Sequence, residues 1–148
     1  MVPHTVQAGR YTGDLDHHRV IAESALLAEV SRPIAEPRRI LLMTATIRPP
    51  AGARALKVRD PAVRLAEYDS ALSFYCGLLG RGIDQIVFAE NSEAELEPLR
   101  NRVAELGHFA GVEFLSFNGL DYPPQFGRGY GEFKLIDYAM AHSRFLLD

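Results

Sequence analysis

Three glycines at alternate positions, Gly127, Gly129 and Gly131, lie directly before a run of apolar residues with helical spacing. Glycine leaves the backbone N–H groups accessible, and the N-terminal end of a helix carries a partial positive charge, so this combination suits a phosphate or another anion. Arg128 adds a guanidinium that can bind a diphosphate through two parallel hydrogen bonds. The alternative is that the glycines only allow a tight turn with positive φ angles.

Two residues beside these glycines have side chains that suit a sugar or a nucleotide. Glu132 is the best acidic candidate for binding substrate hydroxyls, although a carboxylate at a helix N-terminus is also stabilised there without any role in function. Tyr130, like Tyr122 and Phe126, offers a ring for stacking on a base or a sugar. An irregular loop also needs aromatic anchors, so both interpretations stay open.

Composition limits the classes of protein to which this chain can belong. It has 148 residues, the size of one ordinary domain, and a net charge of −3, which gives no general attraction for nucleic acid or an anionic membrane. No apolar run approaches the roughly 20 residues that cross a bilayer, and the N-terminus lacks the pattern of a signal peptide. The single cysteine, Cys76, fits a reducing cytoplasm, and its helical apolar surroundings favour a core position over a nucleophile. We therefore expect a cytoplasmic globular protein.

Strands and helices alternate along the second part of the chain. Apolar runs between turn residues predict buried strands over residues 40–47, 83–89 and 112–117. Asp60 followed by Pro61 predicts the first helix start, and Ser92 with Glu95 has the spacing of a capping box for the second. The predicted helices cover residues 61–79, 95–106 and 132–145.

This alternation predicts the fold class and the domain organisation. We expect residues 1–38 to form an N-terminal helix and a proline-containing linker, and residues 39–148 to form an α/β domain. The expected architecture is a three-layer, mostly parallel, Rossmann-like sheet with that extra N-terminal helix. Ligands of such sheets bind beyond the carboxyl ends of the strands, which selects residues 46–50, 90–92 and 117–131 as one predicted edge. Arg64 lies in the first helix, where solvation or pairing with Glu67 explains it at least as well as ligand binding.

An ordered set of segments resembles the N-terminal, nucleotide-binding half of bacterial GT-A-like glycosyltransferases of capsule and lipopolysaccharide synthesis. The resemblance covers residues 39–146 and is carried by residues 44–50, 60–68, 87–92 and 121–139. It implies that the chain binds a nucleotide-sugar and transfers the sugar to a glycan acceptor. The nucleotide-binding residues by position are Thr46, Ile47, Arg48, Glu90 and Asn91. The diphosphate or sugar would lie near Gly127, Arg128, Gly129, Tyr130, Gly131 and Glu132.

The chain departs from this family in two respects. The family uses an Asp-x-Asp segment after a later strand to hold Mg²⁺ or Mn²⁺ against the diphosphate, whereas the only such segment here, Asp14-Leu15-Asp16, precedes the first strand and is explained by helix capping. The family's C-terminal half, which supplies the metal site, the acceptor site and usually the catalytic base, has no counterpart. We therefore assign no metal ligand and no catalytic residue, and expect the chain to be incomplete as an enzyme.

Two other functions remain open. One is a different Rossmann-type site for NAD or a mononucleotide, although residues 48–60 lack the Gly-x-Gly-x-x-Gly fingerprint of dinucleotide sites. The other is a non-catalytic module that binds a partner. A truncated sheet would also expose an edge strand, from which we expect self-association or pairing with a missing half.

Overall fold

The computed structural model describes residues 36–51 and 56–147. The chain divides into two compact units, Met1–Pro37 and Arg38–Asp148, and the second unit contains every element described below. The expected N-terminal helix and the Asp14–Asp16 segment lie outside the described residues.

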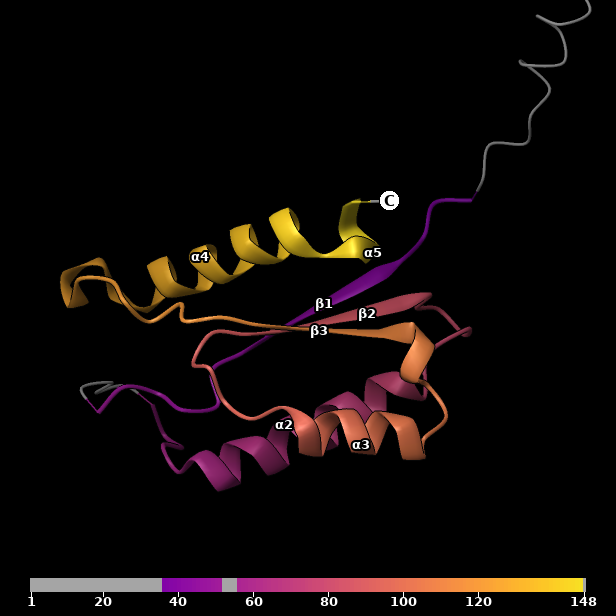
Figure 1. The fold of residues 1–148 in the computed structure, drawn as a ribbon, viewed down its shortest axis with the longest axis horizontal. Helices are drawn as coiled ribbons and strands as arrows, with labels where there is room; N and C mark the ends of the chain where they lie inside the picture. The colour runs from indigo at the N-terminus through magenta and orange to yellow at the C-terminus, as the bar shows by residue number, and fades with distance from the viewer. Residues whose placement is uncertain (1–35, 52–55, 148) are drawn as a thin grey trace, which may run out of the picture. The chain divides into compact units, whose positions relative to one another are not determined.

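A parallel sheet of three strands forms the centre of the second unit (Figure 1). The strands are β1 (Ile40–Ala45), β2 (Gln85–Glu90) and β3 (Val112–Ser116), in the order β1-β2-β3. Their ends align, because Ala45 pairs with Glu90 and Glu90 with Ser116. The central strand has five consecutive buried residues, Ile86–Glu90, as expected for a strand covered on both faces.

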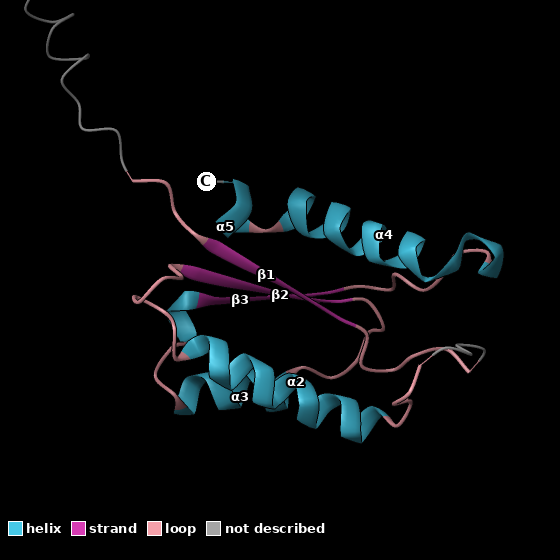
Figure 2. Ribbon diagram, turned by 180° about the vertical axis from the view of Figure 1, so that it is seen from behind, coloured by secondary structure: helices cyan, strands magenta, loops and turns pink. Residues whose placement is uncertain are grey.

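Helices cover both faces of the sheet. Figures 1 and 2 show α2 and α3 on one face and α4 and α5 on the other. The bounds are α2 (Pro61–Cys76), α3 (Glu97–Glu105), α4 (Gly127–His142) and α5 (Arg144–Leu147), with 3₁₀ turns η1 (Phe109–Gly111) and η2 (Pro124–Phe126). The structure is thus an α/β fold with a parallel sheet, compatible with a Rossmann-like arrangement. No helix in the described ranges is both long and apolar enough to cross a bilayer.

The side chains of β2 point alternately to the two faces of the sheet and contribute to the core on each face. Ile86 and Phe88 pack against α2 and α3, in a cluster that includes Leu72 and Cys76, whereas Ala89 packs with Leu135 of α4 on the other face. Cys76 is completely buried, and this burial raises the pKa of its thiol. Its predicted core position is confirmed.

The start of α2 is confirmed, and its physical basis is visible. The carboxylate of Asp60 accepts hydrogen bonds from the N–H groups of Ala62 (2.8 Å) and Val63 (3.4 Å), which have no partner inside the helix. Pro61 occupies the first turn, where a missing N–H costs nothing.

The predicted capping box at Ser92 and Glu95 is wrong. Helix α3 begins at Glu97, its N-cap residue is Leu96, and no side chain caps it. Ser92 is engaged elsewhere, because its hydroxyl donates to the carboxylate of Glu90. The carboxylate of Glu90, at the end of β2, is a stronger acceptor, so the hydroxyl of Ser92 bonds to it and does not cap α3.

The last helix begins earlier than predicted, at Gly127 and not near Glu132. The expected glycine-rich loop is therefore the first turn and a half of α4. Of the three glycines in this segment, Gly127 alone has a positive φ, of 73°. Gly131 has a different reason to be glycine: a Cβ there would lie 2.4 Å from the hydroxyl oxygen of Tyr122.

Candidate functional site

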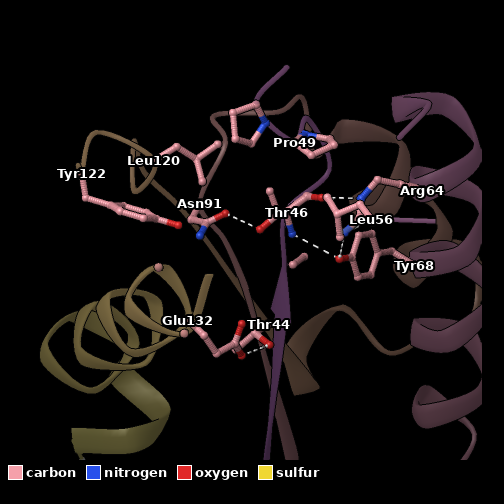
Figure 3. A pocket seen from close by; sticks show the side chains of 14 residues that line it. Thr44, Thr46, Pro49, Leu56, Arg64, Tyr68, Asn91, Leu120, Tyr122 and Glu132 are labelled. Atoms are coloured by element: carbon pink, nitrogen blue, oxygen red, sulfur yellow. Dashed lines mark hydrogen bonds between the residues drawn. The ribbon is translucent and has the colours of Figure 1, made fainter. Parts of the chain in front are cut away.

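A cavity of about 350 Å³ lies at the carboxyl edge of the sheet (Figure 3). Its volume is within the range of small-molecule sites, roughly 300–1,000 Å³. The end of β1, the loop that follows it, α2, the loops after β2 and β3, and the start of α4 all contribute. This is the edge at which parallel sheets bind ligands, and the edge that the sequence predicts.

The α2 wall of the cavity carries Arg64 and Tyr68. The guanidinium of Arg64 donates to the carbonyl oxygens of Thr46 (Nε, 2.6 Å) and Val58 (Nη1, 3.3 Å) and to the hydroxyl of Tyr68 (Nη2, 2.9 Å). The two side chains are four residues apart on one helix face, which lets them meet. The expected pairing of Arg64 with Glu67 is not among the contacts of Arg64 in the described structure.

The middle of the cavity is formed by Thr46 and Asn91. The hydroxyl of Thr46 donates to Oδ1 of Asn91 at 2.7 Å, and the N–H of Thr46 donates to the hydroxyl of Tyr68 at 3.2 Å. Because its side-chain oxygen accepts this hydrogen bond, Asn91 still has the two N–H donors of its side-chain amide. Pro49, Leu56 and Leu120 add apolar side chains to the lining of the cavity.

The α4 wall carries the carboxylate of Glu132. The hydroxyl of Thr44 in β1 donates to its Oε1 at 2.7 Å, and Oε2 receives no hydrogen bond from any residue that the structure describes. Tyr122 lies against Gly131 on the same side, so the ring closes the cavity next to this carboxylate. An ion pair between Asp121 and Lys134 ties the preceding loop to α4 and lowers the pKa of Asp121.

Glu90 lies behind the cavity and does not line it, which corrects the expectation that it contacts a nucleotide. The side chain is completely buried, and its carboxylate accepts from the N–H groups of Ile47 (3.0 Å), Ser92 (3.0 Å) and Ala94 (3.1 Å). Strand β2 thus holds the loops after β1 and β2 through one interior side chain. Ile47, also predicted to contact the nucleotide, is a buried core residue that is 3% exposed.

The other predicted residues divide into two groups. Thr46, Asn91, Gly129, Gly131 and Glu132 line the cavity. Arg48, Gly127 and Tyr130 do not; Arg48 is exposed, and its N–H donates to the hydroxyl of Ser92 at 2.8 Å. The side chain of Arg128 lies outside the described part of the structure.

The fold brings to the cavity several residues that the sequence analysis does not assign to the site. Arg64 and Tyr68 had a usable signal, namely their four-residue spacing on a helix that begins beside the predicted edge. Thr44 had a weaker one, since it is a polar residue inside an apolar strand. Tyr122 is a candidate for stacking from its residue type, but its contact with Gly131 depends on the path of the chain.

The described residues do not by themselves fit a divalent metal ion. No group of three or more His, Cys, Asp or Glu side chains gathers in this part of the chain, and Glu132 is the one described carboxylate that lines the cavity. Mg²⁺ and Mn²⁺ prefer several oxygen ligands, with carboxylates among them. The Mg²⁺ or Mn²⁺ that the resemblance implies therefore remains a prediction, with no ligands assigned here.

Comparisons with protein-family models, with curated proteins and with solved structures found no match to this chain. Function is therefore inferred from the residues of the chain itself.

Proposed function

We propose that the domain binds a nucleotide-sugar donor and serves in cytoplasmic transfer of a sugar to a bacterial surface polysaccharide. The observation that carries this proposal is the distribution of polar groups in the cavity at the carboxyl edge of the sheet. Hydrogen-bond donors from Arg64 and Tyr68 lie on the α2 side, and the carboxylate of Glu132 lies on the α4 side (Figure 3). A ligand that carries both anionic groups and hydroxyls suits such a cavity.

Glu132 is the group that would recognise the hydroxyls of this ligand. Its Oε2 is free among the described residues, while the bond from Thr44 fixes its Oε1. An ionised carboxylate accepts hydrogen bonds from hydroxyls at roughly twice the strength of a neutral acceptor. The amide group of Asn91 adds donors between the two walls.

The experiment is a titration followed by NMR or thermal shift, with UDP, GDP, CMP and NAD, and then with the sugar conjugate of the nucleotide that binds, each with and without Mn²⁺. We expect one nucleoside diphosphate to bind and its sugar conjugate to bind more tightly. Glu132→Gln should weaken the sugar conjugate more than the bare diphosphate. Glu67→Gln removes an exposed carboxylate of α2 outside the cavity and is the matched control.

The arms of this titration separate the alternatives. Binding of NAD in preference to the nucleoside diphosphates would replace the proposal with a dinucleotide site. A folded protein that binds none of the four nucleotides would contradict the proposal and favour a module that binds a partner. A requirement for Mn²⁺ would support the metal that the resemblance implies.

A further inference from the structure

We propose that the anionic group of the ligand binds at Arg64 and Tyr68, on the α2 wall, and not at the glycine-rich first turn of α4. The inference takes the nature of the ligand, a phosphate or diphosphate ester, from the proposed function. Its placement rests on the hydrogen bonds of the two side chains.

The charge of Arg64 is not neutralised by any carboxylate in the described part of the chain. Its three hydrogen bonds go to uncharged oxygens, of Thr46, Val58 and Tyr68. A guanidinium has five N–H groups, so one N–H on each terminal nitrogen remains to donate. The side chain is partly buried and held by these three bonds, which presents the charge to the cavity in a fixed orientation.

Tyr68 supplies another donor at the same place. Its hydroxyl oxygen accepts from the N–H of Thr46 at 3.2 Å and from Nη2 of Arg64 at 2.9 Å, which occupies both of its acceptor positions. The phenolic proton is then available to donate to a further acceptor, and no described residue accepts it. The ring is fixed by an edge contact with Phe88, whose centroid is 5.9 Å away.

The opposite wall is unsuited to an anion. Among the described side chains that line the cavity, Arg64 is the cation and Glu132 the carboxylate. A diphosphate beside Glu132 would meet a like charge, whereas beside Arg64 it meets an opposite charge and oriented donors. The ligand therefore lies with its anionic group toward α2 and its hydroxyls toward α4.

Calorimetric titrations of Arg64→Gln and Tyr68→Phe with UDP, uridine and inorganic pyrophosphate test this placement. We expect Arg64→Gln to weaken UDP and pyrophosphate by about tenfold to a hundredfold, as for the loss of charged hydrogen bonds, and uridine by less than about twofold. Tyr68→Phe keeps the ring and should weaken the two anions by about threefold to tenfold. Arg81→Gln, which removes an exposed cation outside the cavity, should change none of the three.

Equal affinity of the wild type and Arg64→Gln for pyrophosphate and UDP would overturn the inference, as would an equal loss for uridine. If Arg64→Gln does not fold, as judged by circular dichroism, Tyr68→Phe decides by the same comparison. Failure of the proposed function has a different signature. In that case pyrophosphate binds with dependence on Arg64, while no nucleotide-sugar binds more tightly than pyrophosphate.

Discussion

The hydroxyl of Thr44 donates to Oε1 of Glu132 at 2.7 Å, which joins the end of the first strand to a helix 88 positions later in the chain. This contact brings the α4 wall of the cavity to the edge of the sheet. It also leaves Oε2 of Glu132 without a hydrogen-bond donor among the described residues. The cavity is therefore a product of the complete second unit and not of any one motif.

Replacement of Glu132 by glutamine should weaken the binding of a nucleotide-sugar by about fivefold to tenfold, because a charged acceptor becomes a neutral one. The side chain is exposed, so the free energy of unfolding should change by less than about 0.5 kcal/mol. Titration and urea unfolding of the same preparation measure the two quantities. A large loss of stability would identify the residue as a structural tie and not a ligand-binding group.

The glycines of α4 offer a matched pair of substitutions. A Cβ at Gly131 would lie 2.4 Å from the hydroxyl oxygen of Tyr122, whereas a Cβ at Gly129 meets nothing within 4 Å. We expect Gly131→Ala to displace Tyr122, to destabilise the protein by about 1–3 kcal/mol and to weaken ligand binding. Gly129→Ala should stabilise it by up to about 1 kcal/mol, because alanine favours a helix.

Thermal unfolding and titration of both variants check this prediction. The double variant Gly131→Ala, Tyr122→Ala should recover part of the lost stability, since the clash is removed. Equal effects of the two single substitutions would show that the ring of Tyr122 keeps its position when residue 131 has a side chain.

Replacement of Glu90 by alanine should destabilise the protein by roughly 3 kcal/mol or more. The substitution leaves the N–H groups of Ile47, Ser92 and Ala94 without their acceptor and opens a void behind the cavity. Urea unfolding measures this loss, with Glu105→Ala as the control. Among the described residues, the carboxylate of Glu105 pairs with Arg102 in an exposed ion pair, which is worth little. A stable Glu90→Ala variant that loses ligand binding would restore the direct role expected from sequence.

The stability of the domain should depend on pH through Glu113 of β3. Burial acts to raise the pKa of this carboxyl, but hydrogen bonds from Ser143 and Arg144 and from the N–H groups of Arg144 and Phe145 outweigh it and lower the pKa below the ordinary value of 4.5. A carboxyl with a lowered pKa stabilises the fold above its unfolded pKa, and this contribution is lost as the pH falls through the folded value. We therefore expect stability to decline below about pH 4.5.

Urea unfolding between about pH 7 and pH 3 measures this dependence. In Glu113→Gln the domain should be less stable at neutral pH, and the difference from the wild type should shrink in acid. An unchanged difference across this range would assign the pH dependence to other carboxyls.

The elements of the sheet and the start of α2 were predictable, because their signals are local. Continuous apolarity in residues 86–89 and the pair Asp60-Pro61 suffice. The capping box failed because Ser92 has a stronger partner in Glu90. A local sequence pattern does not show whether a side chain will cap a helix or will bond to a buried carboxylate that lies beside it only in the folded chain.

The candidate site was predictable as an edge of the sheet but only partly as residues. Glu90 and Asn91 are neighbours at the end of β2, yet the first points into the interior and the second lines the cavity. Successive residues of an extended chain point in opposite directions, so one residue of such a pair is directed inward. The sequence alone did not reveal which face of this strand end would meet the loop after β1.

The buried carboxylate of Glu90 supports the loops around the cavity but does not itself line the cavity. Three loop N–H groups converge on this one side chain, so part of the loop backbone is held by a residue that does not line the cavity. Arg64 and Tyr68 also bond to backbone atoms of Thr46, so we expect the loop backbone to persist when the side chains of Thr46, Asn91 and Leu120 are changed. Libraries randomised at these three positions, with Glu90 retained, should yield folded proteins with altered ligand preference, and the domain is in that sense a scaffold for re-engineered recognition.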